Sequence, residues 1–206
     1  MKKLLLSPLA LLFIYNFSFA QTTAMDFTKN DCTSGVTHTL FADLDSGYTI
    51  IQAFDMIPNC QLCIDAATEL QIIRDNYTQS NPGMVRWYTT GYLDSYSCSG
   101  MTSWATSHGF TPDAEFDQGA NEVAYYGGMG MPTIVVLGGT DHHVFYKHLG
   151  YSASQIDDIE AAINASISAI TSAPVLQLQE FTVNMFPNPV KDNFTIQLGL
   201  NESSSL

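Results

Sequence analysis

Two cysteines with two residues between them offer the clearest chemistry in this sequence. Cys60 and Cys63 form a Cys-x-x-Cys pair, and this spacing suits thiol–disulfide exchange because one turn of helix brings both sulfurs within bonding distance. If the pair opens a helix, the helix dipole favours a thiolate on Cys60. We therefore expect Cys60 to attack a partner disulfide and Cys63 to resolve the mixed disulfide that results.

The charges around this pair bear on the direction of exchange. Asp55 and Asp65 add negative charge nearby, and no Lys, Arg or His lies between the cysteines. Negative charge disfavours a thiolate and therefore the reduced form. The pattern argues against a strong oxidase and favours a reductase or an inert disulfide. Asp55 itself is expected to lie past the end of the strand that precedes the pair.

The cysteine pair lies where a predicted strand turns into a predicted helix. Residues 48–54 form a mostly apolar run, which indicates a buried strand, and Pro58 and Asn59 break this run. From Cys60 onward, apolar residues recur at three- and four-residue steps, as on one face of an amphipathic helix. These residues are Ile64, Ala67, Leu70, Ile73 and Tyr77.

The rest of the chain alternates between strand-like and helix-like segments. We expect a hairpin around the turn at 32–35, strands at 84–92, 114–116, 133–137 and 143–148, and helices at 101–108, 121–126 and 154–170. This order predicts an α/β fold in which helices cover a mixed sheet with an antiparallel edge. After residues 172–174 the pattern changes to strand-like stretches at 175–185 and 194–198, which predicts a second, β-rich module.

The N-terminus has the features of an export signal. Lys2 and Lys3 precede an apolar run at 4–15, and small residues stand at Ser18 and Ala20. We interpret residues 1–20 as a signal peptide that is removed on export. No later segment approaches the length of a membrane span, so the mature protein is expected to have none.

Composition excludes one class of partner and bears on the remaining cysteines. The formal net charge is -13, and such a surface repels nucleic acid. The four cysteines all follow the predicted signal and form an even set in an oxidising compartment. Cys32 and Cys98 are candidates for a structural disulfide, with free thiols or a different pairing as the alternatives. We expect no cofactor and no resident metal.

The order of these elements resembles the thioredoxin-like superfamily, in particular its exported TlpA-like branch. The likeness covers residues 25–170 and includes the hairpin, the Cys-x-x-Cys pair opening a helix, and the Met131-Pro132-Thr133 turn that enters a strand. It implies a three-layer domain at 21–172 and a cis Pro132 lying against Cys60 and Cys63. It also implies a thiol-disulfide oxidoreductase whose partners are protein thiols or disulfides. The sequence departs from the family pattern at Asn59, where tryptophan is usual.

A second resemblance covers the start of the C-terminal module. Residues 185–194, Met-Phe-Pro-Asn-Pro-Val-Lys-Asp-Asn-Phe, are similar to the opening of the type A sorting domain of type IX secretion cargo. This implies the secretion machinery as a partner for residues 173–206, and a location in the periplasm, on the cell surface or in the medium. Such domains continue for several more strands, so we expect this one to be truncated.

Two alternative functions stay open at this point. In the first, the fold is a non-catalytic secreted binding module and the Cys60–Cys63 bond is structural. In the second, Cys60 and Cys63 handle copper together with histidines, since thiolate and imidazole suit that metal. The candidate histidines are His142, His143 and His148, and this alternative resembles the Sco-type copper chaperones.

Overall fold

A mixed five-stranded sheet forms the centre of the protein. The computed structural model describes residues 22–128, 130–171, 181–186 and 195–200, so the predicted signal peptide lies outside the described residues. The strands are β3 (Thr49–Asp55), β4 (Val85–Gly91), β5 (Ala114–Phe116), β6 (Thr133–Gly138) and β7 (His143–Leu149), in the order β5-β4-β3-β6-β7. Strands β3, β4 and β5 run parallel, whereas β6 pairs antiparallel with β3, and β7 with β6. The predicted α/β fold with a mixed sheet is confirmed.

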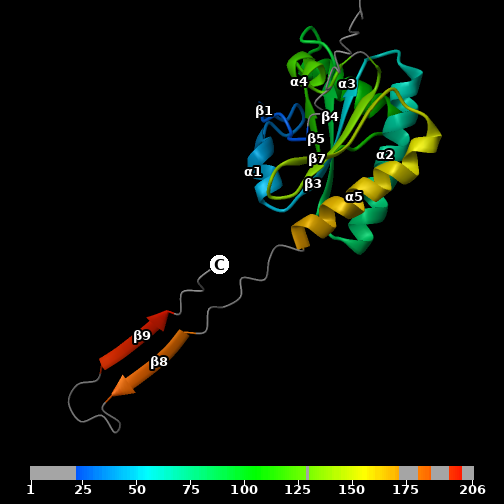
Figure 1. The fold of residues 1–206 in the computed structure, drawn as a ribbon. Helices are drawn as coiled ribbons and strands as arrows, with labels where there is room; N and C mark the ends of the chain where they lie inside the picture. The colour runs from blue at the N-terminus through cyan, green and yellow to red at the C-terminus, as the bar shows by residue number, and fades with distance from the viewer. Residues whose placement is uncertain (1–21, 129, 172–180, 187–194, 201–206) are drawn as a thin grey trace, which may run out of the picture.

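Helices cover both faces of this sheet. In Figure 1, α2 (Gln61–Ser80) and α5 (Ile156–Thr171) lie together on one face, and α1 (Leu40–Asp45) lies on the other. Helix α4 (Ala120–Tyr125) contributes to the core on the α1 side, and α3 (Cys98–His108) contributes Trp104 to the core beneath α2. A short 3-10 helix, η1 (Ala153–Gln155), leads into α5. The architecture is therefore three layers.

Strand β3 is buried along its whole length because both of its faces are covered. Successive side chains of a strand point to opposite faces. Ile51 and Ala53 pack in the core beneath α2 and α5, while Ile50 and Phe54 pack in the core on the α1 side. This explains why the sequence shows a mostly apolar run here and not an alternating one.

The N-terminal hairpin consists of β1 (Thr28–Asn30) and β2 (Thr37–Thr39), which pair antiparallel as predicted. Helix α1, directly after it, was not predicted. It spans only 6 residues and has no side-chain hydrogen bond at its N-cap. Its buried face consists of Leu40 and Leu44, too few positions to establish a helical period in the sequence.

The C-terminal strands form a separate two-stranded sheet. Strands β8 (Phe181–Phe186) and β9 (Thr195–Leu200) pair antiparallel, which agrees with the change to strand-like pattern in this part of the chain. The other residues of the predicted sorting domain at 173–206 lie outside the described residues. Over the described ranges, none of the helices combines the length and the apolarity that crossing a membrane requires.

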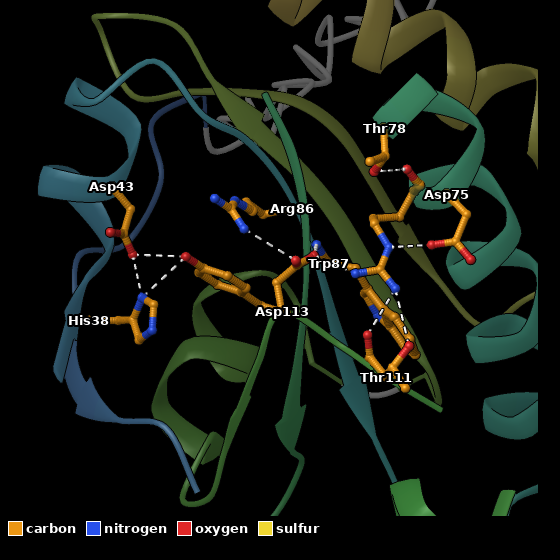
Figure 2. Close-up of polar contacts among 10 residues, drawn as sticks. His38, Asp43, Asp75, Thr78, Arg86, Trp87, Thr111 and Asp113 are labelled. Atoms are coloured by element: carbon orange, nitrogen blue, oxygen red, sulfur yellow. Dashed lines mark hydrogen bonds and ion pairs between the residues drawn. The ribbon is translucent and has the colours of Figure 1, made fainter. Parts of the chain in front are cut away.

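Asp113, just before β5, ties α2 to the sheet (Figure 2). Its carboxylate accepts a hydrogen bond of 2.8 Å from the backbone N–H of Trp87 in β4 and forms ion pairs with Arg74 of α2 at 3.0 Å and with Arg86 at 3.3 Å. The Arg74 guanidinium also donates to the carbonyl of Thr111 at 2.9 Å. This network fixes the C-terminal half of α2 against the sheet. Because α2 begins at the cysteine pair, the network also helps to position that pair.

Candidate active site

Cys60 and Cys63 are joined by a disulfide at the start of α2. Cys60 is the N-cap residue, and its sulfur accepts a hydrogen bond of 3.2 Å from the N–H of Cys63. The sulfur of Cys63 accepts one of 3.4 Å from the N–H of Met56, which follows β3. Cys60 is 7% exposed and Cys63 is 0% exposed. Cys60 is therefore the slightly more exposed residue of the two, and Cys63 is fully buried.

Asp55 is the last residue of β3, so the expectation that it lies past the strand end was wrong. Its side chain is on the same face as those of Ile51 and Ala53, which is the face that packs against Cys63. It is fully buried, and Thr89 of β4 donates a hydrogen bond of 2.7 Å to Oδ2, while Oδ1 has no partner among the described residues. Burial raises the pKa of Asp55 to about 7, against the smaller opposing effect of the Thr89 hydrogen bond.

The Met131–Pro132 turn lies at the same end of the sheet. The peptide bond between these residues is cis, as the family resemblance implied. Met131 packs against the core cluster that contains both cysteines. The carbonyl of Pro132 accepts a hydrogen bond of 2.7 Å from the N–H of Gly150, which ties the turn to the loop after β7. Cys60, Cys63 and Pro132 thus gather where β3 ends and β6 begins.

Cys32 and Cys98 form the second disulfide. Cys98 is the first residue of α3, and Cys32 lies in the turn between β1 and β2. The backbone N–H of Cys32 also donates to the carbonyl of Glu115 at 2.7 Å. The bond links α3 and the N-terminal hairpin across 66 residues of sequence.

Two of the three histidines of the copper alternative lie at the far end of the sheet from the Pro132 turn. His142 and His143 lie at the β6–β7 turn, the opposite end of β6 from Pro132. His142 stacks on Phe41 and pairs with Asp45 at 2.8 Å. His148 pairs with Ile134 at the Pro132 end of β6, and its side chain contacts Gln155. Within the described ranges, no group of three or more His, Cys, Asp or Glu residues is arranged to hold a metal ion.

The arrangement at the pair can support nucleophilic exchange. A sulfur at the N-cap of a 20-residue helix is stabilised as a thiolate by the helix dipole and by the N–H that it accepts. A buried carboxyl with a pKa near 7 can give or take a proton close to neutral pH. The site therefore offers a slightly exposed cysteine, a fully buried cysteine and a buried carboxyl that can carry a proton, all on adjoining elements.

Comparison with known proteins identifies the fold. No protein-family profile matches the chain, and no curated protein matches it. Among solved structures, a candidate thiol:disulfide interchange protein DsbE from Chlorobium tepidum is similar with a TM-score of 0.58 and 16% identity, covering 71% of this chain and 96% of that one. The exposed lipoprotein thioredoxin Etrx1 from Streptococcus pneumoniae gives 0.51 and 16%, covering 68% and 99%. BsSco, a member of the Sco family of cytochrome c oxidase assembly proteins, gives 0.55 and 13%, covering 71% and 94%.

These similarities show that the chain has the thioredoxin-like fold. Proteins of different function share it, as the names of the three neighbours indicate, so function has to be argued from the site. Two features of the site were missed in the sequence. The first is the burial of Asp55, which follows from β3 extending one residue further than expected. The second is Tyr151, which is distant from the cysteine pair in sequence although its loop lies beside the first turns of α2.

Proposed function

We propose that this protein is an exported thiol-disulfide oxidoreductase that acts on protein disulfides through Cys60 and Cys63. One observation carries the proposal. The two cysteines form a disulfide at a helix start in which Cys60 is 7% exposed and Cys63 is fully buried, and a buried Asp55 lies on the face that packs against Cys63. A purely structural disulfide requires neither the difference in exposure nor the buried carboxyl.

In the reducing direction, exchange begins with both cysteines reduced. The Cys60 thiolate attacks one sulfur of a client disulfide, a mixed disulfide forms, and the other client sulfur leaves as a thiolate. Cys63 then attacks the Cys60 sulfur of the mixed disulfide and expels the second client thiolate. The client gains two electrons and the pair ends as a disulfide. In the oxidising direction the same steps run backwards, with a client thiolate attacking Cys60.

Asp55 supplies the proton transfer that these steps require. Before Cys63 attacks, its thiol has to lose a proton in a site from which water is excluded, and the Asp55 carboxylate takes it. In the reverse reaction, Asp55 returns this proton to the Cys63 thiolate. A pKa near 7 allows both transfers at neutral pH. Pro132, at the same end of the sheet, is proposed to hold open the face on which an extended client lies.

The redox potential of the Cys60–Cys63 pair tests this proposal. The protein is equilibrated in graded glutathione buffers, the free thiols are trapped, and mass spectrometry separates this pair from Cys32 and Cys98. A potential between about -270 and -120 mV is expected, because exchange proteins work in that range. A potential below about -300 mV would instead indicate a structural bond and favour the non-catalytic binding module.

A matched pair of variants supplies the control. Cys60→Ser should abolish exchange with a disulfide-containing protein, whereas Cys98→Ser, which alters the other disulfide, should leave exchange measurable. Loss of folding in Cys60→Ser without any exchange in the parent protein would support the non-catalytic alternative.

Export and sorting are separate parts of the proposal. The predicted signal at residues 1–20 and the sorting-domain resemblance within 173–206 support a location outside the cytoplasm. Expression of the full chain with and without residues 173–206 in a bacterium that has type IX secretion would test the second part. Cell-surface or medium location that depends on those residues is the expected result, and equal location of both forms would contradict it.

A further inference from the structure

A groove beside the cysteine pair combines apolar, aromatic and acidic walls. It encloses about 490 Å³ between the first turns of α2 and the loop that follows β7. From α2 it is lined by Leu62, Asp65 and Glu69, and from the loop by Tyr151. Leu62 is 49% exposed, although it is a large apolar residue. The loop is fastened to the Pro132 turn by the Gly150 to Pro132 hydrogen bond of 2.7 Å, so the groove adjoins the proposed reaction centre.

The two carboxylates of this groove lie on the same side of α2. Asp65 and Glu69 are four residues apart, which places their side chains one above the other on a helix. Both line the groove together with Tyr151. Burial first, and then the charges of Glu69 and Asp65, raise the pKa of the Tyr151 hydroxyl. Gln61 donates a hydrogen bond of 2.8 Å to Asp65. No ion pair within the described ranges uses Asp65 or Glu69.

These walls together match one kind of side chain. Leu62 offers apolar surface to the aliphatic stem of a long cationic residue. Tyr151 adds an aromatic ring to which a cation is attracted, and Asp65 and Glu69 offer charge-assisted hydrogen bonds. An apolar client residue would leave the carboxylates without partners, and an acidic one would be repelled. The groove is therefore complementary to arginine or lysine.

We propose that the client segments of this protein carry an arginine or lysine close to their reactive cysteine, and that Asp65, Glu69 and Tyr151 recognise it. This inference rests on the proposed exchange function. Asp65 and Glu69 begin about 8 to 14 Å along α2 from Cys60, from the helical rise per residue. An extended client covers about 3.3 Å per residue, so the recognised residue lies about two to four positions from the client cysteine.

Reporter peptides with one cysteine test this recognition. Three peptides differ only in carrying Arg, Gln or Glu three residues from the cysteine, and a second set places the residue on the other side. The rate at which each thiol opens the Cys60–Cys63 disulfide is measured by acid quenching and mass spectrometry. Because a nearby charge alters the reactivity of the peptide thiol itself, each rate is divided by the rate of the same peptide with oxidised glutathione.

The Arg peptide should react about fivefold to tenfold faster than the Gln peptide in one of the two sets, as two partly exposed charge pairs allow. This preference should shrink between about 20 mM and 300 mM salt because the charges are screened. In an Asp65→Asn/Glu69→Gln double variant it should disappear. The matched control, Asp45→Asn/Asp141→Asn, removes two exposed charges near the opposite end of the sheet and should retain it.

The outcomes separate the two proposals. Equal corrected rates for the Arg, Gln and Glu peptides, or a preference that survives in the Asp65→Asn/Glu69→Gln variant, would overturn the recognition and leave the exchange function standing. If no peptide opens the Cys60–Cys63 disulfide, the exchange function fails and the recognition fails with it. The salt dependence in the parent protein gives a second reading that does not depend on any variant.

Discussion

Asp55 and Thr89 lie on the neighbouring parallel strands β3 and β4, and the Thr89 hydroxyl donates a hydrogen bond of 2.7 Å to a carboxylate that water does not reach. This single hydrogen bond does not offset the burial of the charge, because the pKa of Asp55 is raised to about 7. A buried carboxyl held in this state costs stability wherever it would be ionised in the unfolded chain.

The stability of the protein is therefore expected to fall with rising pH through this group. The unfolded chain loses the Asp55 proton near the ordinary value of 3.8, whereas the folded protein keeps it up to about 7. Between these values the folded state binds more protons, so the free energy of unfolding decreases as pH rises. Asp55→Asn removes this contribution. The difference in the free energy of unfolding between Asp55→Asn and the parent should therefore increase, in favour of the variant, by up to about 4 kcal/mol from pH 4 to pH 7.

Urea denaturation of both proteins at several pH values, with disulfides intact, measures this difference. The other titrating groups are common to both proteins and cancel in the comparison. A difference that does not change with pH would show that Asp55 ionises normally in the folded state.

The same substitution should also alter the kinetics of exchange. Without the Asp55 carboxylate, Cys63 has no buried proton acceptor, and resolution of the mixed disulfide should slow by about 100-fold at neutral pH. Attack by Cys60 should change far less, because Cys60, unlike Cys63, is not fully buried. Stopped-flow measurement of mixed-disulfide formation and decay separates the two steps. Equal slowing of both steps in Asp55→Asn would argue for a disturbed fold instead of a lost proton acceptor.

The central elements and the cysteine pair could be predicted from the sequence because their signals are local. Residues 48–54 form a mostly apolar run because β3 is buried on both faces, and Cys60 and Cys63 are recognisable by spacing alone. Helix α1 was missed because its 6 residues show no period. Helix α3 begins at Cys98, before the predicted start, because Ser97 caps it through a hydrogen bond to the N–H of Gly100.

The environment of the site could not be predicted in the same way. The pKa of Asp55 depends on the covering of the sheet by α2, which no local pattern reports. The groove formed by Asp65, Glu69 and Tyr151 depends on where the loop after β7 meets α2. A helical spacing of four residues places the carboxylates of Asp65 and Glu69 together, but the position of Tyr151 beside them depends on tertiary structure.

Cys63→Ser should trap the protein on its clients. The Cys60 thiolate can still attack a disulfide in this variant, but no second thiol expels the client, so a mixed disulfide accumulates. Cys60→Ser should trap far less, because Cys63 is 0% exposed. Non-reducing electrophoresis after incubation with a disulfide-containing protein measures both. Stronger trapping by Cys60→Ser would reverse the roles assigned to the two cysteines.

Loss of the second disulfide should lower stability without abolishing exchange. The Cys32–Cys98 bond closes a loop across 66 residues of sequence. A link of that length reduces the entropy of the unfolded chain and stabilises the fold by about 4 kcal/mol. The Cys32→Ser/Cys98→Ser variant should therefore unfold at a lower urea concentration, while the rate at which reporter peptides open Cys60–Cys63 stays within about twofold under native conditions. Lost exchange at unchanged stability would mean that the second pair takes part in the reaction.

Asp113 should matter more to stability than its partly exposed position suggests. Its carboxylate accepts from the N–H of Trp87, a buried residue, and pairs with Arg74 and Arg86. Asp113→Ala leaves that N–H without its acceptor and should cost about 2–3 kcal/mol.

Asp75 provides the matched control, because it also pairs with Arg74, at 2.7 Å, but its side chain is 59% exposed. Asp75→Ala should cost less than about 1 kcal/mol. Urea denaturation at neutral pH compares the two variants. Equal losses would mean that the hydrogen bond to the N–H of Trp87 contributes no more to stability than an exposed ion pair within α2.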